Sequence, residues 1–127
     1  MTRTARCACK AAAITVEGEP QMNGICHCRN CQRRSGSAFG WSTYFPDSQI
    51  LSVEGDLAAY DLKIEPPQTR HFCRICGTTL YWKSGFMPES TGIAGGCFCG
   101  DLPDPTFTSH GHTACAWVTL PEAWPRA

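Results

Sequence analysis

Three cysteines within six residues form a CxCxxC pattern at Cys26, Cys28 and Cys31. Cys26 and Cys28 lie on one side of an extended segment because successive side chains alternate, and a tight turn brings Cys31 back to the same point. Three thiolates so placed favour a thiophilic cation such as Zn²⁺, and three protein ligands leave its fourth tetrahedral position open for catalysis or exchange. Two other interpretations are a closed structural site with a fourth ligand from elsewhere, and three core cysteines that bind no metal.

Two further cysteine pairs supply a second set of thiols. Cys7 and Cys9 repeat the CxC spacing, and Cys73 and Cys76 form a CxxC turn followed directly by Gly77. Glycine takes positive φ readily, so Gly77 lets this turn close around a metal, as in a zinc knuckle. A closed tetrahedral site needs four ligands, and the two pairs supply them while leaving the CxCxxC triple intact. We therefore predict a four-thiolate structural zinc site that contributes folding free energy of about 10 kcal/mol.

The charge of the three-cysteine site indicates which chemistry it favours. Three thiolates on one Zn²⁺ give a net negative charge, so the metal polarises a bound water less than a zinc held by three neutral imidazoles. Exchange of a thiol ligand is therefore more natural at this site than hydrolysis by a metal-bound water. A substrate thiol that takes the fourth position would lose its proton on binding.

The composition restricts the class of protein. The chain has 127 residues, of which 43% are hydrophobic, and its formal net charge is zero. This length fits one domain, residues 1–127, that can bury its own core. A protein that binds nucleic acid would normally have a basic face, so we expect no nucleic-acid partner.

The cysteine content bears on the cellular compartment. The chain has no export signal and no run of about 18 apolar residues, so we expect no membrane span and a cytoplasmic, reducing location. Ten cysteines in a secreted chain would indicate disulfides, whereas in a reducing compartment they indicate metal binding.

Short runs of β-branched and aromatic residues alternate with turn signals and predict a mainly β fold of small antiparallel sheets. The predicted strands are 11–16, 21–25, 39–45, 50–53, 57–64, 68–72, 78–82 and 91–98, with one or two more within 107–118. We expect 21–25 to return antiparallel along 11–16, and Glu54-Gly55-Asp56 to join 50–53 and 57–64 in a hairpin. One short helix, 29–35, follows the CxCxxC motif and stops at Gly36.

The order of these motifs resembles a known family. A CxC pair is followed by CHCxxC with Arg-Ser-Gly-Ser-Ala-Phe after it, and then by His-Phe-Cys-x-x-Cys-Gly. From Cys7 to about Trp124 this order resembles the glutathione-dependent formaldehyde-activating enzyme family, also called the GFA or CENP-V domain. The resemblance implies an Mss4-like fold of β-sheets with two Zn²⁺ ions per chain.

The resemblance also implies roles for these residues. The structural zinc is held by four cysteines, Cys7, Cys9, Cys73 and Cys76. The catalytic zinc is held by Cys26, Cys28 and Cys31. The implied activity is carbon–sulfur lyase chemistry, which joins formaldehyde to glutathione as S-hydroxymethylglutathione or reverses that step. The implied partners are therefore a small thiol, glutathione, and an aldehyde.

Polar residues beside the triple have two interpretations each. Arg29, Arg33 and Arg34 either bind the carboxylates of glutathione in bidentate fashion or form a solvated helix face. The small residues 35–38 either cradle a carboxylate with backbone N–H groups or form a plain loop.

Several further residues could bind a metal. One group either forms a third metal site, supplies a ligand to the three-cysteine site, or is simply buried. This group is Cys97, Cys99, His110, His112 and Cys115. His71 either donates a hydrogen bond to a neighbouring thiolate or is an ordinary strand histidine. His27 should point away from the adjacent cysteines, so we expect no ligand role for it.

Two other functions compete with the enzyme. The first is a non-catalytic, zinc-stabilised binding module with the same fold, and the second is a thiol-rich metal or redox buffer. Two tightly held zinc ions favour the enzyme or the module, whereas three or more labile ions favour the buffer. Calorimetry with glutathione separates the enzyme from the module, because a specific ligand raises apparent stability.

Overall fold

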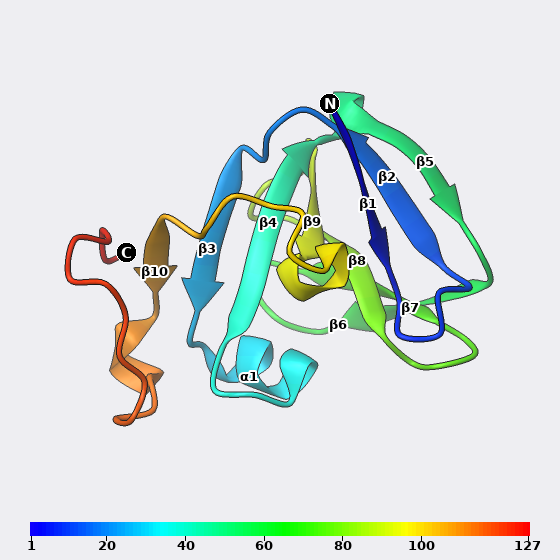
Figure 1. Ribbon diagram of the computed structural model, residues 1–127. Coiled ribbons are helices and arrows are strands. Elements are labelled where there is room, and N and C mark those ends of the chain that lie inside the picture. Colours follow the sequence, from blue (N-terminus) through cyan, green and yellow to red (C-terminus); the bar gives the residue numbers. More distant parts are fainter.

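The computed structural model describes residues 1–127 as two β-sheets of unequal size (Figure 1). The smaller sheet is antiparallel, with strand order β1-β2-β5. Its strands are β1 (Thr2–Arg6), β2 (Ala13–Glu17) and β5 (Ile50–Glu54). In Figure 1 this sheet lies in front of the upper right part of the molecule.

The larger sheet has seven strands in the order β10-β3-β4-β9-β8-β7-β6. Its strands are β3 (Met22–Cys26), β4 (Gly40–Pro46), β6 (Leu57–Leu62), β7 (Gln68–Cys73), β8 (Thr79–Ser84), β9 (Ser90–Ala94) and β10 (Phe107–Ser109). All neighbours pair antiparallel except β10, which runs parallel to β3. The predicted mainly β, Mss4-like fold class is therefore confirmed.

Only one α-helix is present, and it is the predicted one, α1 (Arg29–Ser35). Cys28 is its N-cap, and the sulfur of Cys28 accepts a hydrogen bond from the backbone N–H of Cys31. Gly36 ends the helix with φ of 62°, a left-handed conformation that glycine adopts without strain. Three short 3₁₀ turns complete the fold: η1 (Asp47–Gln49), η2 (Gly95–Phe98) and η3 (Gly111–Thr113).

The apolar core lies between the two sheets. Ile14 and Val16 of β2 are fully buried with Phe45 of β4, and Phe98 of η2 packs against Phe45 with ring centroids 5.9 Å apart. Two motif cysteines, Cys7 and Cys73, belong to the same buried cluster. The segments that carry these two cysteines are therefore continuous with the core.

The N-terminal strand β1 was not expected from the sequence pattern. It pairs antiparallel with β2 and turns Arg3 and Ala5 inward. Arg3 takes a core-facing position because its guanidinium donates to the Gly18 carbonyl at 2.7 Å and pairs with Glu19 at 3.1 Å. A charged residue at an inward position hides the alternation of apolar and polar residues by which strands are recognised.

Two predicted strand pairings are wrong. β3 does not return along β2: it pairs with β4 and β10, while β2 lies between β1 and β5. The turn at Gly55 does not close a hairpin, because β5 pairs with β2 and β6 pairs with β7. Gly55 has φ of 103° and lies against the backbone of Ala11 and Ala12, so this turn carries the chain from one sheet to the other.

The predicted strand 91–98 is also too long. β9 ends at Ala94, and the chain turns into η2 at Gly95. A Cβ at Gly95 would lie 2.3 Å from the indole of Trp41, so only glycine permits this close approach. The turn takes Phe98 out of the sheet and into the core. None of the helices is both long and apolar enough to cross a membrane.

Candidate metal centres and the cavity beside one of them

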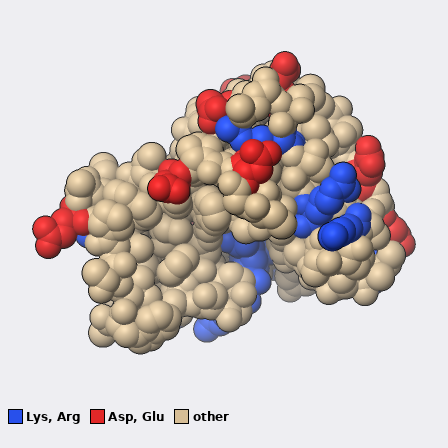
Figure 2. Space-filling view, viewed as in Figure 1, with Lys and Arg blue, Asp and Glu red and all other residues tan.

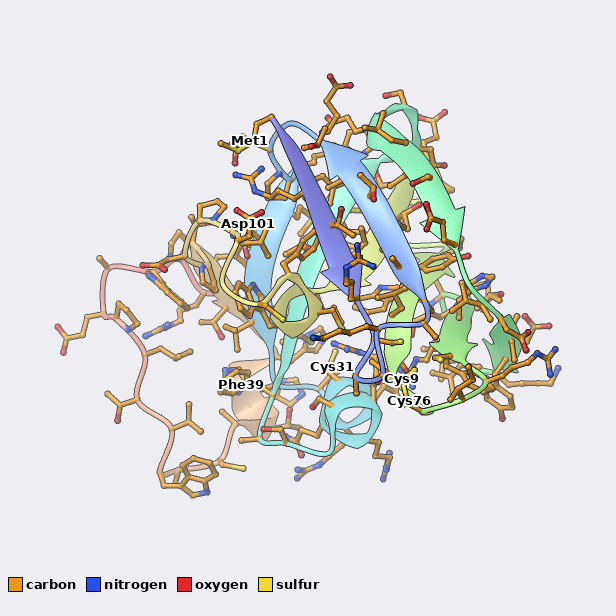
Figure 3. The ribbon with its side chains drawn as sticks, turned by 45° about the vertical axis from the view of Figure 1, so that its right-hand side comes forward. Met1, Cys9, Cys31, Phe39, Cys76 and Asp101 are labelled. Atoms are coloured by element: carbon orange, nitrogen blue, oxygen red, sulfur yellow. The ribbon has the colours of Figure 1, made fainter.

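The structure brings four thiols together at the joining point of the two sheets. The sulfurs of Cys7, Cys9, Cys73 and Cys76 all lie within 4.8 Å of one another. Figure 3 shows Cys9 and Cys76 side by side, on turns that follow β1 and β7. The Cys7–Cys9 and Cys9–Cys73 sulfur distances are 3.6 and 3.8 Å. Two sulfurs bound to one tetrahedral zinc lie about 3.8 Å apart, so this donor set fits the ion.

The surroundings of the four-thiol cluster are those of a closed site. Cys7 and Cys73 are buried, and each sulfur accepts a backbone N–H hydrogen bond, at 3.3 and 3.4 Å. The hydroxyl of Thr78 lies 3.2 Å from the sulfur of Cys76, and this hydrogen bond lowers the pKa of Cys76 to about 5. These donors stabilise thiolates, which are the form that binds a metal.

The second cluster is built from one short segment. Cys26 ends β3, Cys28 caps α1 and Cys31 lies in the first turn of α1, and their three sulfurs lie within 4.8 Å of one another. All three are half-buried. Cys31 lies on α1, apart from the turns that carry Cys9 and Cys76 (Figure 3). The same sulfur chemistry therefore fits zinc here, with three protein donors instead of four.

The three thiols compete for protons. The hydrogen bond from Cys31 lowers the pKa of Cys26 to about 4, and the same interaction raises the pKa of Cys31. One thiolate therefore forms easily, whereas repulsion between like charges opposes the third. A bound divalent cation removes that repulsion, which is why three adjacent thiols suit a metal ion.

No fourth protein donor completes the three-thiol cluster. The ring Nδ1 of His110 lies 3.4 Å from the sulfur of Cys26, but the group of mutually close donor atoms contains the three sulfurs and no imidazole. His110 is exposed and follows β10, so it borders the cluster. Sequence reasoning left its role open, and the parallel pairing of β10 with β3 is what brings it here.

The other candidate ligands do not form a third site. No group of three donor atoms within 4.8 Å includes any of them. They are Cys97, Cys99, His112 and Cys115. Cys97 packs against the core and Cys99 is exposed, and neither sulfur belongs to the group of close donor atoms at the three-thiol cluster.

The structure separates the three arginines of α1. Arg29 donates to the side chain of Gln32 at 2.9 Å and is exposed, as is Arg33. Arg34 instead stacks its guanidinium on the indole of Trp82, 4.2 Å from the ring centroid. Arg34 lies three residues after Cys31 and therefore on the same side of the helix, a signal that sequence reasoning missed.

The small residues after α1 form a helix end and not an anion cradle. The backbone N–H groups of Gly36 and Ser37 both donate to the carbonyl of Gln32. The Ser35 hydroxyl donates to the carbonyls of Cys31 and Phe39, each at 2.9 Å. Because these groups are already paired, the plain-loop interpretation of 35–38 holds.

His71 and His27 supply no ligand atom to either cysteine cluster. His71 stacks on Tyr81, with ring centroids 4.3 Å apart and planes 6° apart, and makes no hydrogen bond to a thiol. His27 is buried, and its Nε2 lies 2.9 Å from the hydroxyl of Thr108. His27 thus points away from the neighbouring cysteines, as expected.

The three-thiol cluster opens onto a cavity of about 540 Å³. Cys26, Cys28 and Cys31 line one side of it. Large apolar side chains line much of the rest: Met22, Ile25, Tyr44, Ile64, Pro66, Phe86 and Phe107. Their elements are far apart in the chain, so sequence reasoning did not find this cavity. The cluster is therefore accessible to a small molecule, whereas none of the four thiols of the other cluster lines the cavity.

Tyr44 supplies a polar group to this cavity. Its hydroxyl oxygen accepts a hydrogen bond from the indole N–H of Trp82 at 3.0 Å, so its own hydrogen is free to donate to a ligand. Burial raises the pKa of Tyr44, which keeps the hydroxyl protonated. A Cβ at Gly92 would lie 2.1 Å from the Trp82 indole nitrogen, so this glycine makes room for the pair.

Comparisons with known proteins agree with this geometry. The family model of the glutathione-dependent formaldehyde-activating enzyme matches residues 2–114. The crystal structure of a Rhodobacter sphaeroides protein is similar, with a TM-score of 0.63 and 25% sequence identity, over 79% of this chain and 91% of that chain. The match extends over most of the chain, including both cysteine clusters. The chain therefore belongs to the glutathione-dependent formaldehyde-activating enzyme family.

Proposed function

We propose that the protein is a zinc-dependent carbon–sulfur lyase that forms or cleaves an adduct between a thiol and an aldehyde. The observation that carries this proposal is the three-thiol cluster, which has no fourth protein donor and faces a cavity of about 540 Å³. The family's name supports glutathione and formaldehyde as the first thiol and aldehyde to test. Zinc is the metal we propose at both clusters, two ions per chain.

The proposed reaction forms one carbon–sulfur bond, between the thiol sulfur and the carbonyl carbon of the aldehyde. The thiol loses its proton to solvent, its sulfur attacks the aldehyde carbon, and the electron pair of the carbonyl moves to oxygen, which takes up a proton. The reverse sequence cleaves the adduct. Zinc held by Cys26, Cys28 and Cys31 would lower the pKa of the substrate thiol.

The chain's own groups position the reactants. The cavity walls hold the organic part of the thiol beside the three cysteines and restrict its motion, which favours attack on a second bound molecule. The Tyr44 hydroxyl, fixed by the N–H of Trp82, donates a hydrogen bond to the oxygen on which charge develops. In the reverse direction the same hydroxyl holds the adduct oxygen as the carbonyl re-forms.

The four-thiol cluster has a separate role in this proposal. Its cysteines lie after β1 of the smaller sheet and at or after the end of β7 of the larger sheet, and two of them belong to the buried core. We propose that its zinc stabilises the fold and takes no part in the reaction, and that residues 1–127 act as one domain.

The proposed partners are small molecules, in a reducing compartment such as the cytoplasm. Thiol ligands stay reduced there. Figure 2 shows acidic and basic side chains interspersed on the face it displays, without a broad basic surface for nucleic acid. We therefore propose no nucleic-acid partner.

Zinc content and adduct exchange together test the function. Purified zinc-loaded protein is analysed for bound metal, and exchange between formaldehyde and its adduct is followed by NMR with glutathione and with 2-mercaptoethanol. We expect two tightly held zinc ions and exchange faster than the uncatalysed rate with at least one thiol. The Cys28→Ser variant should lose that acceleration.

Other outcomes would assign other functions. Two bound zinc ions with no acceleration by either thiol would indicate a zinc-stabilised binding module. Three or more labile ions would indicate a metal buffer.

A further inference from the structure

The walls of the cavity beside the three thiols are mostly apolar. Phe107 of β10 lies against Gly24, where a Cβ would be 2.5 Å from the phenyl ring, and Phe86 packs edge-on against Tyr44 with ring centroids 6.1 Å apart. Ile64 and Pro66 close a further part of the wall. A ligand that fills this space exchanges water for aromatic and aliphatic surface, which favours an apolar group.

The charged residues of the cavity also disfavour an anionic ligand. None of the residues that line it is a lysine or an arginine; His110 is the one basic side chain in the wall, and one carboxylate, Glu65, lines it as well. Glutathione carries two carboxylates, and a carboxylate that leaves water without a cationic partner is strongly disfavoured.

Arg34 and Arg70 lie close to the cluster, but neither is among the residues that line the cavity. Arg34 stacks on Trp82 and lines a different cavity. Arg70 donates to two residues of the cavity wall, the side chain of Gln68 at 2.7 Å and the carbonyl of Asn30 at 3.4 Å, and these bonds hold its guanidinium behind the wall. Neither guanidinium lines the cavity, so neither offers a bidentate partner to a carboxylate bound there.

We infer that the thiol used at this site has an apolar body and no carboxylate, so that glutathione is not its best substrate. The inference rests on the proposed function, because it concerns which thiol enters thiol–aldehyde chemistry at the three-cysteine site. Apolar walls would select for the body of the thiol, and Glu65 would select against an anion.

Three thiols test this inference with formaldehyde as the common aldehyde. Glutathione diethyl ester lacks the two carboxylate charges of glutathione and adds two ethyl groups, and 2-phenylethanethiol supplies an apolar body with no charge. Adduct exchange on zinc-loaded protein is measured by NMR, and each rate is divided by its uncatalysed rate. We expect kcat/KM at least tenfold higher for the ester and for 2-phenylethanethiol than for glutathione.

The outcomes separate the inference from the function on which it rests. If glutathione equals or exceeds either of the other thiols, the inference is wrong while the proposed function stands. If no thiol is accelerated although two zinc ions are bound, the proposed function fails, and the inference fails with it.

Variants at exposed positions of the cavity give a second test. Glu65→Lys should reduce the preference for the ester over glutathione at least threefold, because it places a cation at the wall. Phe86→Ala should reduce the preference for 2-phenylethanethiol by a similar factor, because Phe86 is an exposed aromatic residue at the wall. Glu89→Lys is the matched control, since Glu89 is exposed and lies outside the cavity, and it should leave both ratios unchanged. Unchanged ratios in both Glu65→Lys and Phe86→Ala would overturn the inference.

Discussion

The two cysteine clusters use the same ligand chemistry but are built by the chain in opposite ways. Cys26, Cys28 and Cys31 fall within six residues, and a strand end followed by a helix cap brings them together. In the four-thiol cluster, Cys9 and Cys73 are 64 positions apart and belong to segments joined only by the tertiary fold. Closing that long loop costs chain entropy, which a bound metal offsets when the cluster is complete.

Their surroundings differ as well. The four-thiol cluster contains two residues of the apolar core, whereas the three-thiol cluster lies at the wall of a cavity. A metal bound by four cysteines is closed to substrate, and a metal bound by three has room for one more ligand. Under the proposed function, stability is assigned to the four-thiol cluster and chemistry to the three-thiol cluster, although both use cysteine ligands.

The largest expected effect is on stability at the four-thiol cluster. Cys9→Ser removes an exposed side chain, so little packing is lost and the change reports on the metal. Losing about 10 kcal/mol of metal-linked free energy would exceed the stability of many small domains, so we expect an unfolded protein at 25 °C. Circular dichroism and zinc analysis measure this, with Cys99→Ser, an exposed cysteine outside both clusters, as the control. A folded Cys9→Ser protein with a normal melting temperature would remove the distinction between the clusters.

The next effect is on activity at the three-thiol cluster. Cys28→Ser removes one sulfur donor but leaves a side chain that is a strong N-cap, so α1 should keep its cap. We expect one zinc ion instead of two, at least a hundredfold loss of adduct exchange, and a loss of unfolding free energy smaller than that of Cys9→Ser, so that the protein stays folded at 25 °C because the ligands of this site lie within one short segment. Urea unfolding and NMR exchange measure the two quantities. Global unfolding of this variant would show that both clusters are structural.

A smaller effect is expected from a substitution that disturbs the hydrogen-bonded pair of Tyr44 and Trp82. Gly92→Ala would place a Cβ against the indole of Trp82 and disturb its hydrogen bond to Tyr44. Overpacking of this kind costs about 1–3 kcal/mol, and adduct exchange should slow because the Tyr44 hydroxyl moves. Gly96→Ala is the control, because a Cβ at Gly96 would have no atom within 4 Å. Equal unfolding curves for the two variants would contradict the proposed packing.

The smallest effect should follow from His110→Ala. His110 is exposed and borders the three thiols without joining them, so both zinc ions should remain and exchange should change less than tenfold. Zinc analysis of this variant decides between a three-ligand and a four-ligand site. Loss of one zinc ion from this variant would identify His110 as a fourth protein ligand, and both clusters would then have four ligands.

Much of the local structure was predictable. The helix 29–35 has its bounds at a cysteine cap and at Gly36, and most strands fall within two residues of their predicted ends. These features depend on neighbouring residues alone. The pairings of β3 and of β5 were predicted wrongly, because a turn such as Gly55 is compatible with a hairpin and with a crossing between sheets.

The sequence by itself determined the local geometry of the thiols, since two-residue and three-residue spacings set which side chains lie together in a strand, a turn or a helix. It also indicated the family, through the order of its motifs. Only the tertiary structure decided that Tyr44 lines the same cavity as the three thiols, that Arg34 stacks on Trp82, and that the cavity walls carry no lysine or arginine. Those properties arise where strands distant in the chain meet. Such contacts are selected by the folding free energy of the whole domain, to which no single segment contributes alone.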